Sequence, residues 1–223
     1  MDSFVDTNVA IAYSFSLDPL NFKSNRVFKK YNTIYWSNTV ENEYKKVFKN
    51  KLKLLKEYFK DLKSFLMNDD YTDISFKSLV SFINKKNYSD KDKKKIKSSL
   101  SVFWNKYLDN ELPSKNDVLN AIDCCLFDLS SNIYKKREEW LFQIKLTFKR
   151  IKRYNSIYND LLGKPNVHES DVIIVLDAHD YNLELEEKID FITFDKDFYN
   201  AASQISEFSF NKILGKEDFV FSS

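Results

Sequence analysis

Three acidic side chains each sit beside an apolar segment, and the three segments are far apart in the sequence. Asp6 comes directly after residues 3–5, Asp195 directly after residues 189–194, and Asp171 near the start of an apolar helical pattern. Carboxylate oxygens are the ligands that Mg²⁺ and Mn²⁺ prefer. A divalent metal held by converging carboxylates lowers the pKa of bound water and neutralises charge on a phosphodiester under attack. These acids therefore predict a hydrolytic metal site.

Glu43 is the fourth acid and the most informative one. Val40, Tyr44 and Val47 have the spacing of a helix face that packs on a core, and Glu43 lies within that stripe. A carboxylate on a core-facing stripe is costly unless it meets a cation or a hydrogen-bond donor. Glu41 is about 200° away around the helix and is free to face water. We therefore expect Glu43, and not Glu41, to belong to the site.

The same acids have a simpler interpretation as helix caps. An aspartate after a strand is often the N-cap of the next helix. Asp171 and Asp195 could each be placed only to favour the positive end of a helix dipole. What favours the metal site is the ordered set of four acids with apolar strands around them.

The segments that carry the acids alternate between strand and helix signals. Strands are predicted at residues 3–5, 33–36, 189–194 and 208–214, with a helix after each of the first three. A further helix, capped by Ser170, is predicted before the third strand. Strand–helix alternation at both ends of the chain predicts an α/β fold with a central parallel sheet flanked by helices.

The middle of the chain, about residues 51–164, predicts a large all-helical insertion. The chain has only 2 Gly and 3 Pro, which favours long helices. Asp69-Asp70 predicts a turn, and residues 132–162 predict one long helix that Gly163-Lys164-Pro165 ends. We expect a single domain over residues 1–223, with its α/β parts at about 1–50 and 165–223.

Composition and charge say more about the cellular compartment of the protein than about its binding partner. The chain has 223 residues and a net charge of +2, which neither requires nor excludes nucleic acid. The adjacent Cys124 and Cys125 predict buried free thiols in a reducing compartment. The first residues lack the pattern of a signal peptide, and no apolar run is long enough for a bilayer. We expect a cytoplasmic protein with no membrane partner.

A basic cluster is the candidate for binding nucleic acid. Lys145, Lys149 and Arg153 are spaced at four and form one stripe of the predicted long helix, with Arg150 and Lys152 between them. Positive charge of this kind can hold a phosphate backbone. The alternative is a solvated helix face whose lysine stems cover apolar side chains.

Five segments together resemble the PIN-domain nuclease superfamily. They are Phe4-Val5-Asp6-Thr7-Asn8, Thr39-Val40-x-x-Glu43-Tyr44, Asp171-Val-Ile-Ile-Val-Leu, Phe191-Ile-Thr-Phe-Asp195-Lys-Asp-Phe198 and Ile213-Leu-Gly-Lys-Glu-Asp-Phe219. The fourth segment is the most specific and the second the least. The resemblance covers roughly residues 1–50 and 165–223.

The resemblance implies a PIN-like fold and a metal-dependent endoribonuclease acting on RNA with Mg²⁺ or Mn²⁺. It implies that Asp6, Glu43, Asp171 and Asp195 bind metal, with Asp197 accessory and Thr7 or Asn8 supporting them. Some family members are toxins of toxin–antitoxin pairs, so a cognate antitoxin, another protein partner and a homodimer are open. The long middle segment exceeds what compact toxin members carry. Two rival interpretations remain: a non-catalytic PIN-like scaffold that binds RNA or protein, and a mainly helical interaction protein whose acids are caps.

Overall fold

The structure, a computed structural model, describes residues 1–68, 74–108 and 113–220. Asp69 and Asp70, for which a turn is predicted, lie outside the described residues. The chain divides into two compact units. Unit 1 comprises Met1–Ser14, Leu20–Val47 and Glu138–Ser223, and unit 2 comprises Phe15–Pro19 and Phe48–Arg137.

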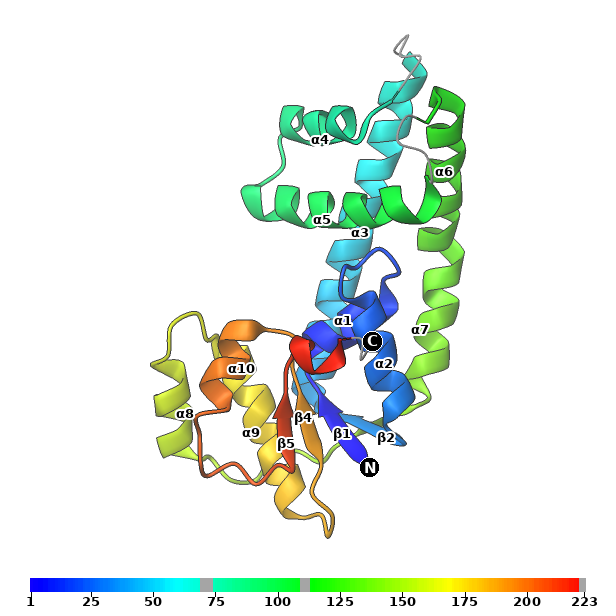
Figure 1. The fold of residues 1–223 in the computed structure, drawn as a ribbon. Coiled ribbons are helices and arrows are strands. Elements are labelled where there is room, and N and C mark those ends of the chain that lie inside the picture. The colour runs from blue at the N-terminus through cyan, green and yellow to red at the C-terminus, as the bar shows by residue number, and fades with distance from the viewer. Residues whose placement is uncertain (69–73, 109–112, 221–223) are drawn as a thin grey trace. The chain divides into compact units, whose positions relative to one another are not determined.

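Unit 1 is built around a parallel sheet. Within the described residues the sheet has five strands in the order β3-β2-β1-β4-β5, and each adjacent pair is parallel. The strands are β1 (Asp2–Val5), β2 (Thr33–Trp36), β3 (Ile144–Leu146), β4 (Asp190–Ile192) and β5 (Lys212–Leu214). In Figure 1 the arrowheads of β1, β4 and β5 point the same way. The predicted α/β class with a central parallel sheet is confirmed, so the mainly helical alternative loses its basis.

The helices fill most of the remaining chain. They are α1 (Thr7–Ser14), α2 (Asn21–Lys30), α3 (Asn38–Asn68), α4 (Phe76–Lys85), α5 (Asp90–Tyr107), α6 (Lys115–Phe127), α7 (Ile133–Leu141), α8 (Asn155–Leu162), α9 (Glu169–Leu183) and α10 (Lys196–Ala202), with a π-helical turn η1 (Asp128–Asn132) and a 3-10 turn η2 (Lys216–Phe219). Among the described residues, every helix is too short or too polar to span a bilayer.

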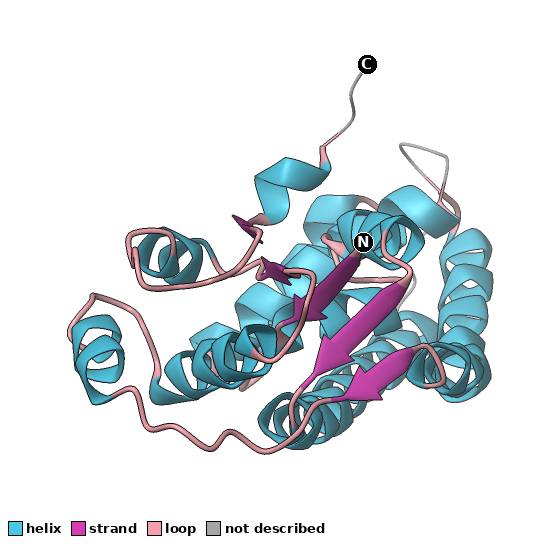
Figure 2. Cartoon of the chain, turned by 90° about the horizontal axis from the view of Figure 1, so that it is seen from below, coloured by secondary structure: helices cyan, strands magenta, loops and turns pink. Residues whose placement is uncertain are grey.

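The two faces of the sheet pack against different helices. Successive side chains of a strand point to opposite faces. Trp36 of β2 packs on Tyr44 of α3 and on Trp140 of α7, with ring centroids 5.6 and 5.5 Å apart. Its neighbour Tyr35 packs on Tyr181 of α9 at 5.0 Å. Figure 2 shows the strands lying between helices, as a sheet covered on both faces requires.

Because all strands are parallel, their carboxyl ends meet at one edge, which we call the carboxyl edge. The chain moves from β1 to β2 on one side of the sheet and from β4 to β5 on the other. The order therefore reverses between β1 and β4, and open α/β sheets bind ligands outside such a switch point. Asp6 follows β1 directly, and Thr193 follows β4.

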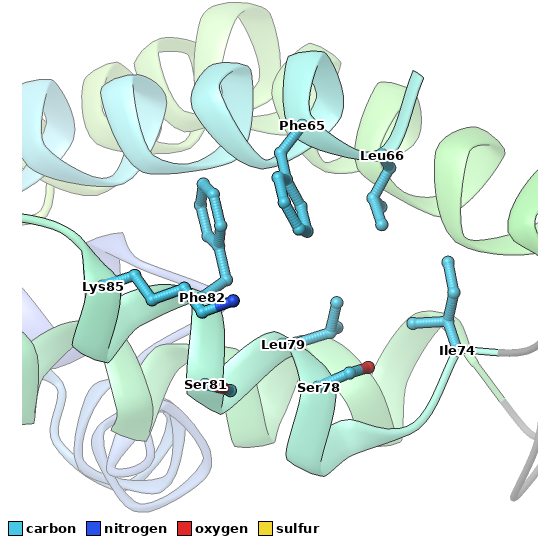
Figure 3. A pocket seen from close by; sticks show the side chains of 8 residues that line it. All are labelled: Phe65, Leu66, Ile74, Ser78, Leu79, Ser81, Phe82 and Lys85. Carbon is cyan, nitrogen blue, oxygen red and sulfur yellow. The ribbon is translucent and has the colours of Figure 1, made fainter. Parts of the chain in front are cut away.

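Unit 2 is helical and has its own aromatic core. Tyr58 and Phe59 of α3 and Phe103 of α5 are fully buried. A small cavity of about 90 Å³ lies between α3 and α4, where Phe65 and Phe82 face each other with centroids 4.7 Å apart (Figure 3). Among the described residues its lining is mostly apolar and includes no carboxylate, cysteine or histidine.

The long helix predicted for residues 132–162 is wrong. Helix α7 ends at Leu141, β3 pairs with β2 at the edge of the sheet, and α8 begins only at Asn155. The segment 51–164, predicted to be all helical, therefore contains a strand. Lys145, Lys149 and Arg153 give the physical reason: like charges four residues apart destabilise a helix, whereas residues 144–146 gain sheet hydrogen bonds.

Candidate functional site

Asp6 is the most buried of the four acids, with 1% of its surface exposed. Its backbone N–H donates to the Ile192 carbonyl at 3.0 Å, which ties the end of β1 to β4. Its Oδ1 accepts from the Thr7 backbone N–H at 2.5 Å, and its Oδ2 accepts from the Thr193 hydroxyl at 2.7 Å. Burial raises the pKa of Asp6 to about 7. The hydrogen bond from Thr193 opposes that shift, and the charges of Asp171 and Glu43 add to it.

Glu43 lies in the second turn of α3 and is half-buried beside fully buried Val40 and Tyr44. Its Oε2 accepts from the Thr7 hydroxyl at 2.8 Å. Thr7 therefore donates to two acids, through its backbone to Asp6 and through its side chain to Glu43. Glu41 instead pairs with Lys45 on the same helix at 2.7 Å. The two glutamates are both intermediate in exposure and differ in their partners, Thr7 for Glu43 and Lys45 for Glu41.

Asp171 lies in the first turn of α9. Its Oδ2 accepts from the His168 backbone N–H at 3.1 Å, and His168 is the N-cap residue, where Ser170 was predicted. Burial raises the pKa of Asp171, that hydrogen bond lowers it, and the charges of Asp195 and Glu43 raise it further. Asp171 is therefore both part of a helix terminus and electrostatically linked to the other acids.

Asp195 is the N-cap of α10, as predicted. Its Oδ1 accepts from the Phe198 backbone N–H at 2.9 Å. Its own N–H donates to the Thr193 hydroxyl oxygen at 3.2 Å. The capping interpretation is thus correct for this residue, and its charge still contributes to the pKa of Asp171. Asp195 can cap α10 and also belong to the candidate site, because the cap uses only one of its carboxylate oxygens.

Asn8 and Thr193 hold the ends of β1 and β4 together. The Asn8 amide donates to Asp6 Oδ2 at 2.7 Å, and its Oδ1 accepts from the Phe194 N–H at 2.8 Å. Thr193 is fully buried and bonds to both Asp6 and Asp195. The sequence predicted a supporting role for Asn8 and missed Thr193. The signal was a polar residue inside an apolar strand, because a buried hydroxyl needs a partner.

Asp197 has a different environment from the other acids. It is exposed on α10, and its Oδ2 accepts from the Asn166 amide at 3.1 Å. Both residues line a hollow of about 340 Å³. A second hollow of about 330 Å³ lies beside Asp195 and is lined also by Tyr199 and Lys216. Both hollows therefore lie beside α10, and Asp195 alone of the four acids lines one of them.

The four carboxylates have the right chemistry for a hard divalent cation, but their side chains do not converge on one point. Four carboxylates, at the end of β1, in α3, in α9 and at the N-cap of α10, suit Mg²⁺ or Mn²⁺. Within residues 1–68, 74–108 and 113–220, no three His, Cys, Asp or Glu side chains converge closely enough to hold a metal ion. The acids act on one another through their charges.

The basic residues lie on a strand and a loop. Lys145 is on β3, and Lys149, Lys152 and Arg153 are exposed in the loop before α8. Arg150 does not project beside them, because its Nε lies 3.5 Å from Asp177 Oδ1. The Thr39 hydroxyl also donates to Asp177, at 2.9 Å. The predicted helical stripe is therefore wrong, although four of the five cations in the cluster are exposed.

Comparison of the chain with protein-family models, with curated proteins and with solved structures finds no match in any of the three.

Proposed function

We propose that this protein is a metal-dependent endoribonuclease of PIN-like fold. One observation carries the proposal: Asp6, Glu43, Asp171 and Asp195 come from four separate elements and interact electrostatically at the carboxyl edge of a parallel sheet. Holding like charges together is unfavourable unless a cation or a proton relieves it. RNA as the substrate rests on the resemblance of the motifs around these acids.

Each part of the site has a role in such a reaction. The four carboxylates would hold Mg²⁺ or Mn²⁺, which when bound lowers the pKa of water and neutralises charge on the phosphate. Thr7, Asn8 and Thr193 fix the orientation of Asp6 by donating to both of its oxygens. Such supporting hydrogen bonds are characteristic of metal sites. The buried position of Asp6 strengthens its interaction with a cation.

A non-catalytic scaffold is the rival, and one observation favours it. Every one of the four acids already accepts a hydrogen bond from the chain, and the described residues contain no closed metal cage. Incubating mixed cellular RNAs with the wild type plus Mn²⁺ or Mg²⁺, against an EDTA control, separates the two. The proposal expects metal-dependent fragments with new ends. Full-length RNA under all conditions favours the scaffold.

Replacing Glu43 by Gln is expected to reduce cleavage far more than replacing Glu41 by Gln. Loss of the Glu43 charge removes a carboxylate linked to Asp6, so kcat/KM should fall at least about 10-fold. Loss of the Glu41 charge removes only an exposed pair with Lys45, so kcat/KM should stay within about twofold. The two variants are matched in chemistry and lie two positions apart. Comparable losses of kcat/KM in both variants would show that the face of α3 that carries Glu43 is not the one used in catalysis.

A further inference from the structure

We call the segment from Phe142 to Arg153 the basic–apolar segment. Several of its large apolar side chains are exposed to solvent to an unusual degree. These are Phe142, Leu146, Phe148 and Ile151, which are 91%, 52%, 78% and 82% exposed. The segment also contains five cations and no acid, namely Lys145, Lys149, Arg150, Lys152 and Arg153. In Figure 1 it is the yellow-green stretch between α7 and α8. Clustered exposed apolar groups indicate a binding surface, and the charge indicates an anionic partner.

Buried carboxylates hold this segment in place. Arg150 pairs with Asp177, as described above. Asp180 accepts from the Ile151 backbone N–H at 2.9 Å and from the Tyr154 hydroxyl at 2.6 Å. Both aspartates are on α9 and are 8% exposed. The backbone is therefore anchored, which leaves the exposed side chains presented in a fixed arrangement at a low entropic cost of binding.

Phe148 is the outermost ring of an aromatic row. Its centroid lies 6.4 Å from that of Tyr181, and Tyr181 lies 5.0 Å from Tyr35 of the sheet. The row thus supports Phe148 from behind while 78% of the residue faces solvent. An open aromatic face among lysines is the arrangement on which the bases of single-stranded nucleic acids stack.

The segment starts at the same edge of the sheet as Asp6. Leu146 at the end of β3 is paired with Trp36, so the loop starts at the carboxyl edge. Thr147 extends that pairing by donating to the Trp36 carbonyl at 2.9 Å. Along α9, Tyr181 is ten residues from Asp171, or about 15 Å. Stacked nucleotides at about 3.4 Å each span that distance in about four residues.

We propose that the basic–apolar segment is a binding site for single-stranded RNA, separate from the carboxylates, in which a base stacks on Phe148. Its exposed cations, Lys145, Lys149, Lys152 and Arg153, bind the phosphates. This inference rests on the proposed nuclease function and adds to it a requirement on the length of the RNA. RNA that extends about four nucleotides from the scissile bond reaches both sites, and shorter RNA reaches one.

Binding without catalysis is the first test. With EDTA present, a fluorescent oligouridine of about 12 nucleotides is titrated and its anisotropy measured. Phe148→Ala should weaken binding about tenfold and Phe148→Trp should retain it. Lys149→Gln should make the plot of log association constant against log salt concentration less steep, by about 0.7 in slope. Phe127→Ala is the matched control, since Phe127 is 61% exposed in unit 2. Equal binding by wild type and Phe148→Ala would overturn the proposal.

The length of the substrate is the second test. For Phe148→Ala, the ratio of kcat/KM on the long RNA to kcat/KM on a dinucleotide should fall about tenfold. An unchanged ratio would contradict a separate site. Anionic vesicles that bind wild type but not Phe148→Ala, with no RNA binding, would overturn it in favour of a membrane surface. RNA binding that depends on Phe148, without cleavage in Mn²⁺, would sustain this site and refute the nuclease.

Discussion

Asp6→Asn is expected to lower Mn²⁺-dependent RNA cleavage at least about 100-fold. Loss of a residue that merely supports a metal ligand costs about 10- to 100-fold, and Asp6 is proposed to bind the metal itself. Asn keeps the size of the side chain and one acceptor oxygen but removes the negative charge. Initial rates of cleavage of a labelled RNA at saturating Mn²⁺ measure the loss.

Asp160→Asn is the matched control for that substitution. Asp160 belongs to the same unit, and its carboxylate pairs with Lys164 at 3.3 Å on the surface of α8. Such exposed pairs contribute little, so activity should stay within about twofold. If Asp6→Asn cleaves as fast as Asp160→Asn, the carboxyl edge is not the active site.

The second large effect concerns the metal-free protein and pH. The pKa of Asp6 is about 7 in the folded state and 3.8 for an ordinary aspartate. Between these two values the folded chain holds a proton that the unfolded chain has lost, so stability falls as pH rises through the window. One pKa unit corresponds to about 1.4 kcal/mol, so the shift of about three units amounts to at most about 4 kcal/mol. Asp6→Asn cannot titrate and should lack this dependence.

Urea unfolding in EDTA at pH 5 and at pH 8 measures this effect as a difference between two proteins. The free energy of unfolding of wild type, minus that of Asp6→Asn, should fall by about 2.7 kcal/mol from pH 5 to pH 8, because about two units of the shift lie between pH 5 and the folded pKa of about 7. His179, whose burial lowers its pKa, titrates in both proteins and cancels. Any constant cost of the amide also cancels. A difference that does not change with pH would mean that Asp6 is already ionised at pH 5.

The sequence predicts where the four acids lie in the fold better than it predicts the structure of the segment between them. Asp6 and Asp195 follow short apolar strands, and parallel pairing forces the ends of β1 and β4 together. Glu43 follows from helical spacing alone, because i, i+3 and i+4 positions share a face. These predictions depend on local patterns that tertiary contacts reinforce. The relation between Thr193 and Asp6 depends on strand register, which no local pattern gives.

The segment after Trp140 shows the opposite case. Ile144 and Phe148 follow Trp140 at a spacing of four, which matches a helix. Yet residues 144–146 form the edge strand, and Phe148 is largely exposed. Pairing with β2 decided the structure there, and propensity is a weak prior against tertiary contacts. The sequence also could not show that Arg150 would pair with a buried aspartate.

Thermal unfolding with and without Mn²⁺ tests the central claim most directly, because it needs no knowledge of the RNA target. Metal that binds only the folded state stabilises it by about 2.7 kcal/mol at a hundredfold excess over Kd, which raises Tm by about 5–10 °C for a chain of this size. Wild type should show that shift, and Asp6→Asn and Asp195→Asn should lose most of it. Asn caps a helix about as well as Asp, so Asp195→Asn should leave the metal-free Tm unchanged. A wild type that gains no stability at millimolar Mn²⁺, or variants that gain as much as wild type, would contradict a metal site at the four carboxylates.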